Sequence, residues 1–298
     1  MKIAITGASG FIGTKLCCAL LERGHEVVSL CRNSVGAEST RFGGYQHIPY
    51  VMGETLPQRV IGFSPEALVH LAWDGIPDFS ERRCLENIEA QVRFIRQTRA
   101  LTQLRKFVGA GTCREYGAKN GACIESDRTP PDNYFSWAKQ TLSEYCRISC
   151  QDQQIALVWL RLFYVYGPGQ RTESLIPTLI GSHSSGNKPD MKCPNAANDY
   201  VYVDDVVTAI ILAIEKRDCH GIFNIGSGIT TPVFKVAKTV DQLMQKDSPV
   251  SDLNILEKYG GEPSAGMWAD ITLSARQLDW SPQISLVEGI RRTIRAAR

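Results

Sequence analysis

The stretch KIAITGASGFIG spans residues 2–13, and the interpretation of the fold starts from it. Its apolar beginning, Lys2–Thr6, predicts a buried β-strand, and Gly7, Gly10 and Gly13 follow before a predicted helix. Glycines permit a tight turn that lets the backbone approach a pyrophosphate, while the helix N-terminus offers free N–H groups to phosphates. Glycines also occur in strand-to-helix turns for conformational reasons alone, but dinucleotide binding requires this strand–loop–helix order.

Beyond this loop, short apolar runs alternate with amphipathic helical stretches. The runs are apolar on both faces, as are the strands of a parallel sheet that helices cover on both sides. The expected strands are Lys2–Thr6, Glu26–Leu30, Ala67–Leu71, Lys106–Ala110 and Ile155–Leu160. This alternation predicts an α/β fold with a doubly wound parallel sheet.

The α/β rhythm breaks after Gly167-Pro168-Gly169, where the chain becomes rich in Ser, Pro, Asn and Gly, and it resumes near Tyr200. We therefore predict a large nucleotide-binding domain and a smaller lobe built from later, discontinuous segments. The predicted domain comprises residues 1–166, with 199–225 returning to it, and the lobe comprises 167–198 and 226–298.

Composition argues against several classes of protein. The 298 residues carry a net charge of +2 and no basic run, which argues against a nucleic-acid partner. The ten cysteines lack paired CxxC spacing, so reduced thiols are expected and no metal site. No apolar run approaches the ~20 residues of a membrane helix, and the N-terminus lacks a signal-peptide pattern. A cytoplasmic protein without a membrane partner is expected.

The end of the second predicted strand bears on the choice of cofactor. An NAD site usually places Asp or Glu there, to bond the ribose hydroxyls. This chain has Ser29-Leu30-Cys31-Arg32-Asn33 instead, with no carboxylate. Arg32 is suited to a 2′-phosphate, although a solvated arginine is common at a strand end. The sequence therefore favours NADP(H) over NAD(H).

Several sequence blocks recur in a known order and at known spacing along nearly the whole chain. They are TGASGFIG (6–13), VHLAW (69–73), GTCREYG (111–117), LRLFYVYGPG (160–169), DYVYVDDVV (199–207) and FNIGSG (223–228). In these blocks the chain resembles the extended short-chain dehydrogenase/reductase family, the NAD-dependent epimerase/dehydratase group. It is closest in appearance to its NDP-4-keto-6-deoxyhexose reductases. The resemblance implies a Rossmann domain, a C-terminal lobe that holds a nucleoside-diphosphate sugar, and a homodimer formed through helices near 85–101 and 138–150.

The resemblance also implies the residues of the site. Cofactor contacts are expected from Gly7, Ser9, Gly10, Phe11, Ile12, Gly13, Arg32, Leu71, Ala72 and Lys139. The chemistry of the family uses a Ser or Thr, a Tyr and a Lys. Thr112 falls at the Ser/Thr position, five residues before Gly117, and Lys139 at the Lys position. The tyrosine exchanges a proton with the sugar oxygen, and the nearby ammonium lowers its pKa.

The Tyr-x-x-x-Lys element of the family is altered in this chain. A four-residue step back from Lys139 reaches Phe135, and Tyr134 lies one residue too early. Pro131 gives the same register. Side chains four residues apart share a helix face, whereas five residues apart they are rotated by about 140°.

Three interpretations of this break stay open. Tyr134 supplies the hydroxyl through an irregular first helical turn, and we adopt this interpretation. In the second, Phe135 marks the loss of the acid/base, with another group or a water standing in. In the third, the protein binds cofactor and nucleotide sugar without normal turnover.

The substrate lobe departs from the family pattern as well. Tyr164 stands where many epimerases have asparagine, and Arg171 is the nearest spare cation for a diphosphate. The leading expectation is a reductase that delivers hydride to C4 of an NDP-4-keto-6-deoxyhexose. The alternatives are a 4-epimerase that retains NAD and a non-catalytic nucleotide-sugar-binding protein.

Overall fold

The computed structural model describes residues 1–34, 42–187, 191–245 and 264–297. A seven-stranded, all-parallel sheet forms its centre, in the order β10-β7-β5-β4-β1-β2-β3. The strands are β1 (Lys2–Thr6), β2 (Glu26–Cys31), β3 (Tyr45–Pro49), β4 (Ala67–His70), β5 (Lys106–Thr112), β7 (Ala156–Leu162) and β10 (Gly221–Ile225). The predicted doubly wound α/β fold of Rossmann type is confirmed, and β3 and β10 extend the sheet beyond the expected strands.

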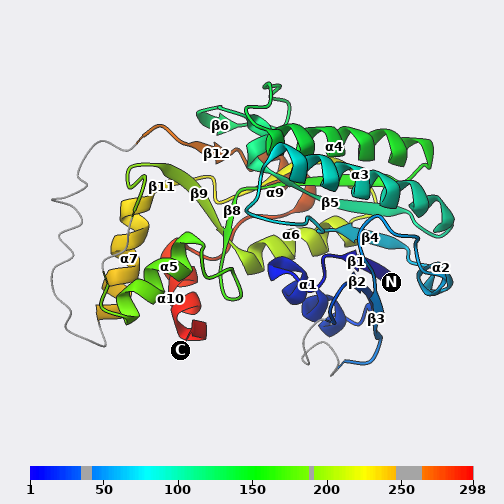
Figure 1. Ribbon diagram of the computed structural model, residues 1–298, viewed down its shortest axis with the longest axis horizontal. Helices are drawn as coiled ribbons and strands as arrows, with labels where there is room; N and C mark the ends of the chain where they lie inside the picture. Colours follow the sequence, from blue (N-terminus) through cyan, green and yellow to red (C-terminus); the bar gives the residue numbers. More distant parts are fainter. Residues whose placement is uncertain (35–41, 188–190, 246–263, 298) are drawn as a thin grey trace.

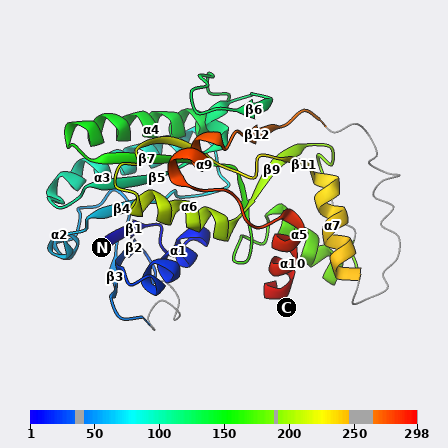
Figure 2. The same ribbon diagram turned by 180° about the vertical axis from the view of Figure 1, so that it is seen from behind.

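Helices cover both faces of this sheet (Figures 1 and 2). One face carries α3 (Glu81–Gln97) and α4 (Tyr134–Asp152), and the opposite face carries α1 (Phe11–Glu22) and α6 (Val203–Glu215). A short helix, α2 (Gln58–Phe63), precedes β4. The central strand β1 is apolar on both sides because both faces are covered, and Ile3, Ala4 and Ile5 are fully buried.

The later segments build a smaller lobe at one end of the sheet, as Figure 1 shows. Its three-stranded sheet has the order β11-β9-β8, and an apolar cluster that includes Ile176, Tyr200 and Ile290 joins this sheet to its helices. The elements of the lobe are β8 (Tyr164–Tyr166), α5 (Leu175–Ser184), β9 (Ala197–Tyr202), β11 (Thr230–Pro232), α7 (Val233–Gln245) and α10 (Leu286–Ala297). Helix α9 (Thr272–Leu278) packs instead against β10 and α6 of the large domain. A two-stranded pair, β6 (Gly121–Cys123) with β12 (Met267–Ala269), ties residues 267–269 to the loop before α4.

Segment 199–225, which was expected to return to the large domain, divides between the two sheets. Its last strand, β10, pairs with β7 in the large sheet, and α6 packs against α1. Its first strand, β9, pairs with β8 and β11 in the small sheet. Residues 246–263 of the predicted lobe lie outside the described residues.

The strand order of the large sheet predicts where a dinucleotide would bind. The chain runs from β1 outward through β2 and β3, then crosses to β4 on the other side of β1. Ligands of such sheets bind in the crevice at the carboxyl ends of the strands, where the strand order reverses. The loops after β1 and β4 meet at this point, so a dinucleotide site is expected there.

Candidate functional site

The glycine loop after β1 is shaped for close backbone approach. Gly7 has a φ of +69°, and a Cβ on it would lie 2.8 Å from the backbone nitrogen of Ala72. A side chain on Gly13 would overlap the Gly7 carbonyl, which accepts a hydrogen bond of 3.0 Å from the Gly10 N–H. Only glycine fits at these two positions, so the loop leaves its backbone open to a phosphate.

A cavity of about 440 Å³ begins at this loop. Gly7, Ser9 and Gly10 line it, together with Leu71 and Ala72 of the segment after β4. Phe11 and Ile12 open helix α1 and pack against the apolar cluster of the lobe. Their backbone N–H groups belong to the first helical turn, where N–H groups lack partners within the helix.

Arg32 lies at the end of β2 on the wall of the same cavity. Its side chain is 72% exposed, and its Nη2 lies 3.4 Å from Oδ1 of Asp74. The other oxygen of Asp74 accepts a 3.0 Å hydrogen bond from Arg83. This end of the cavity therefore presents two guanidinium groups on one carboxylate, and sequence reasoning missed both Asp74 and Arg83. For Asp74, the available signal was a carboxylate four residues after the buried strand β4.

Thr112 and Lys139 lie near each other at the carboxyl end of β5. Thr112 is the last residue of that strand, and its Oγ1 accepts a 3.3 Å hydrogen bond from the Arg114 N–H. The Nζ of Lys139 donates a 3.0 Å hydrogen bond to the carbonyl of Ala110, two residues before Thr112. Burial of Lys139 lowers its pKa from 10.5 to about 8, although the charge of Glu115 acts in the opposite direction.

Tyr134 and Phe135 occupy different environments at the start of α4. Tyr134 is the first residue of the helix and is 50% exposed, whereas Phe135 is 8% exposed. Phe135 packs edge-on against Trp73, with the ring centroids 5.3 Å apart, and Lys139 Nζ lies 4.4 Å from the same indole ring. Within the described residues, no hydrogen bond or ring contact joins Tyr134 to Thr112 or Lys139.

The start of α4 is fixed by a capping box. The Asn133 side chain accepts a 2.9 Å hydrogen bond from the Ser136 N–H, and Ser136 Oγ accepts a 3.2 Å hydrogen bond from the Asn133 N–H. With the helix starting regularly at Tyr134, Phe135 and Lys139 are one helical turn apart on one face. This is why the structure brings Phe135, and not Tyr134, into contact with the ring that covers Lys139.

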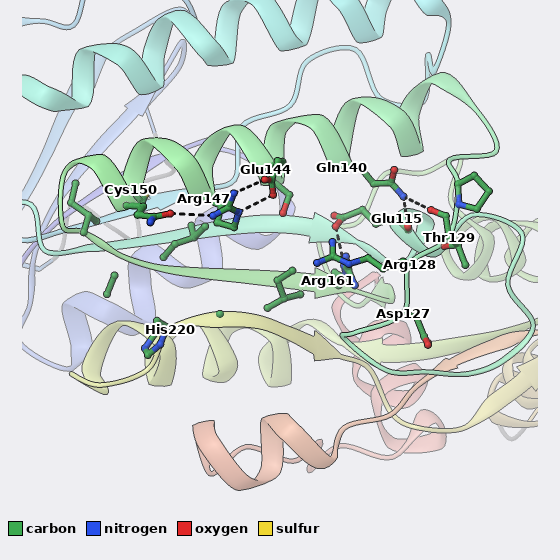
Figure 3. A pocket seen from close by; sticks show the side chains of 18 residues that line it. Glu115, Asp127, Arg128, Thr129, Gln140, Glu144, Arg147, Cys150, Arg161 and His220 are labelled. Atoms are coloured by element: carbon green, nitrogen blue, oxygen red, sulfur yellow. Dashed lines mark hydrogen bonds and ion pairs between the residues drawn. The ribbon is translucent and has the colours of Figure 1, made fainter.

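Glu115 is fully buried and binds the backbone N–H of Thr112. Its carboxylate accepts hydrogen bonds of 2.9 Å from the Thr112 N–H and 3.1 Å from the Trp159 indole, and its other oxygen pairs with Arg161 at 2.9 Å. Figure 3 shows Glu115 and Arg161 meeting beneath α4, on the wall of a second cavity of about 740 Å³. Glu115 positions the end of β5, a role that sequence reasoning did not assign.

Tyr164 and Arg171 lie on the side of the lobe. Tyr164 is partly buried on β8, with its ring centroid 6.0 Å from that of Tyr200, and burial raises its pKa to about 12. Arg171 is exposed in the turn after Gly169. The structure thus places both residues beyond the carboxyl edge of the sheet, in separate environments.

Two further features concern metals and membranes. Across residues 1–34, 42–187, 191–245 and 264–297, no helix combines the length and apolar character of a membrane span. The same part of the chain holds no cluster of three or more His, Cys, Asp or Glu side chains suited to a metal ion. The ten cysteines form no disulfide.

Comparison with known proteins gives a matching family, two relatives and a similar crystal structure. A model described as the NAD dependent epimerase/dehydratase family matches residues 3–226. An uncharacterised UDP-glucose epimerase of Bacillus subtilis is 29% identical over 322 residues, covering 99% of this chain and 97% of that protein. A dTDP-4-dehydro-6-deoxyglucose reductase of Escherichia coli is 25% identical over 312 residues, covering 99% and 97%. The crystal structure of a UDP-glucose 4-epimerase of Thermotoga maritima with UDP-glucose superposes with a TM-score of 0.85 and 25% identity, covering 100% of this chain and 99% of that one.

Proposed function

Because the chain belongs to the NAD dependent epimerase/dehydratase family, we propose that it is an NADP(H)-dependent reductase acting on C4 of a nucleoside-diphosphate 4-keto-6-deoxyhexose. Members of this family are nicotinamide-dependent enzymes of nucleotide sugars. The observation that carries the proposal is the Lys139 ammonium, held by the Ala110 carbonyl two residues before Thr112, near the glycine-loop cavity. Substrate binding by Tyr164 and Arg171 belongs to the same proposal.

The residues present fit a dinucleotide, because side chains on Gly7 and Gly13 would fill the cradle that the loop leaves open. A bound NADPH supplies the hydride that turns the C4 ketone into an alcohol. Thr112 would orient the keto oxygen with its hydroxyl, and Tyr134, brought inward by a rotation of the first turn of α4, would give that oxygen its proton. Lys139 would hold the nicotinamide ribose and, after the same rotation, would stabilise the tyrosinate.

The preference for NADPH is tested by titration and substitution. Purified protein is expected to bind NADPH more tightly than NADH, and Arg32→Ala to weaken NADPH about ten-fold while leaving NADH unchanged. The estimate takes the low end for a phosphate contact because Arg32 is exposed and shared with Asp74. Arg59→Ala, an exposed arginine of α2, is the control. Equal affinities, or tighter NADH, would exclude the preference.

Turnover is tested by following NADPH oxidation with an NDP-4-keto-6-deoxyhexose.

A 4-epimerase is the second candidate, favoured by the two relatives named as UDP-glucose epimerases. It regenerates its cofactor in each cycle, so protein purified with bound NAD and interconverting UDP-glucose and UDP-galactose would replace the reductase proposal.

A third candidate, a nucleotide-sugar-binding protein without normal turnover, is favoured by the packing of Phe135 against Trp73. Binding of cofactor and nucleotide sugar with neither reduction nor epimerisation would establish it.

A further inference from the structure

The second cavity, of about 740 Å³, lies between α4 and the edge of the large sheet (Figure 3). Strand β10 is the last strand at this edge, and α4 packs on β5 and β7. Leu157 of β7 and Ile222 of β10 lie on the same face of the sheet as the fully buried Trp159, but they are only partly buried. Both line the cavity, so its floor is apolar.

The walls of this cavity are charged, and each carboxylate among the lining residues has a cation of its own. Glu144 of α4, for example, accepts hydrogen bonds from Arg147 at 2.6 and 2.9 Å, one on each oxygen. The three ion pairs are Glu115 with Arg161, Asp127 with Lys119, and Glu144 with Arg147.

Arg128 is the cation that these pairs leave over. It lies in the segment before α4, is exposed and lines the cavity, and across the described residues its guanidinium has no ion pair. The hydrogen bond from Arg147 lowers the pKa of Glu144, and the charge of Arg128 adds to this effect. Arg128 is therefore a second guanidinium near a carboxylate that is already paired, and the wall has one positive charge in excess.

Ser143, the residue before Glu144, provides a second observation. It lines the cavity from α4 and is 9% exposed. Within the part of the chain that the structure describes, its hydroxyl has no hydrogen-bond partner and, unlike that of Thr129, is not sealed from the cavity. Hydroxyls at such buried positions normally have a partner, because leaving one unpaired costs free energy. A ligand in the cavity would supply the missing acceptor.

We propose that this cavity binds a small amphipathic carboxylate. Its anionic group accepts hydrogen bonds from Arg128 and Ser143, and its apolar part lies on Leu157 and Ile222. A carboxylate is favoured because it matches the planar fork of a guanidinium and balances one positive charge. The apolar part is favoured because it removes the exposed floor from water. The cavity volume is in the range of about 300–1,000 Å³ that is usual for small-molecule sites.

The inference does not rest on the proposed function. The residues that line this cavity and those that line the glycine-loop cavity are two different sets. Failure to bind NADPH would therefore leave the carboxylate site standing, and failure to bind a carboxylate would leave the proposed cofactor site standing.

The test uses octanoate, an apolar chain with one carboxylate, titrated into the full chain by calorimetry. The parent protein is expected to bind one octanoate. Octanol has the chain without the charge, and butyrate has the charge with a much shorter chain. Each is expected to bind about ten-fold more weakly than octanoate, because one of the two contacts is lost.

Substitutions locate the site. Arg128→Gln is expected to weaken octanoate binding about ten-fold, because a charge-assisted hydrogen bond is removed. Ile222→Thr keeps a β-branched side chain in β10 but makes the floor less apolar, and a loss of about four-fold is expected. Arg59→Gln, at an exposed arginine of α2, is the control and should bind octanoate as the parent protein does.

Unchanged octanoate binding by Arg128→Gln would overturn the inference, as would a parent protein that does not bind octanoate. Octanol or butyrate binding as tightly as octanoate would also overturn it, because the site would then recognise only one part of the ligand. The comparison of the three compounds uses the unaltered chain, so it decides the matter even if a variant does not fold.

Discussion

At the scale of single residues, Tyr134 and Phe135 at the start of α4 have different properties. One has the hydroxyl that proton transfer needs, and the other lies on the helix face of Lys139. Tyr134 carries the hydroxyl but is half-exposed, and Phe135 is buried against the indole that covers the ammonium. Rotation of the first helical turn would be needed to bring Tyr134 to Thr112, against the capping box formed by Asn133 and Ser136.

Reciprocal substitutions of these two residues test the assignment. If Tyr134 is the acid, Tyr134→Phe lowers turnover by about 10²–10⁴-fold and leaves NADPH affinity intact, since only proton transfer is lost. Phe135→Tyr then adds no activity. Steady-state rates and cofactor titrations on both variants decide the matter. Full activity in Tyr134→Phe, with a gain in Phe135→Tyr, would show that this chain has lost the usual acid.

His70 gives a residue-scale prediction about stability. It is buried between Thr6 and Gln91, with both ring nitrogens 2.8 Å from a partner, and burial lowers its pKa from 6.5 to about 4. Between these pH values the unfolded chain binds a proton that the folded chain does not. The stabilisation is therefore complete above pH 6.5 and is lost as the pH falls to 4, on the order of 3 kcal/mol in all.

Urea unfolding at several pH values checks this expectation. His70→Asn is expected to be less stable at pH 7 but to lose less of its free energy of unfolding between pH 6.5 and 4 than the parent protein. His220→Asn, at an exposed position, is the control, and its free energy of unfolding should change with pH as in the parent protein. If the free energy of unfolding of His70→Asn also changes with pH as in the parent protein, the titration of His70 is not the cause.

At the scale of elements, the strand–loop–helix unit of β1 and α1 forms the cofactor cradle. Gly10 has a φ of −80°, which any residue adopts, and a Cβ there would meet only the Gly7 carbonyl, at 3.1 Å. The remaining space around that Cβ is open, and Gly10 lines the cavity. A larger side chain at this position should therefore occupy the space of a phosphate without breaking the fold.

Gly10→Val is accordingly expected to abolish binding of both NADPH and NADH while the thermal midpoint changes little. Fluorescence titration and circular dichroism measure the two effects. Gly43→Val, in an exposed turn with open space around its Cβ, should leave both unchanged. Normal cofactor binding by folded Gly10→Val would mean that the loop has another role.

At the scale of the whole molecule, the outer surface of α3 and α4 exposes three large apolar side chains among its charged ones. Leu85 on α3 is 48% exposed, and Ile148 and Trp137 on α4 are 49% and 38% exposed. Both helices cover the same face of the large sheet (Figure 1). Exposed apolar residues on one face of a protein favour association there, and the homodimer expected through these helices stays a prediction.

The dimer is tested by light scattering after gel filtration. The parent protein is expected to have the mass of two chains, and Ile148→Asp the mass of one, because a buried unpaired charge is costly at an interface. Ile229→Asp changes an isoleucine that is 68% exposed in the smaller lobe, and it should remain dimeric. A monomeric parent protein would contradict the prediction.

The sequence by itself determined strands β1, β2, β4, β5 and β7 of the large sheet, and the glycine loop. Runs such as Lys2–Thr6 and Ala67–Leu71 are apolar on both faces, and this pattern depends only on residues a few positions apart. The glycine spacing is equally local, because all three positions lie between residues 7 and 13. The strands β3 and β10 were not expected, since the pairing of a strand depends on its neighbours in space.

Only the tertiary structure decided which side chains meet at the site. Trp73, Phe135 and Lys139 come together because the loop after β4 meets the start of α4, and Asp74 reaches Arg32 across the carboxyl edge of the sheet. The register of Phe135 was visible in the sequence, but the burial of its ring and the exposure of Tyr134 were not. Periodicity reports the neighbours of a residue along the chain, whereas the charge, burial and hydrogen bonding of a side chain depend on segments that the sheet order brings together.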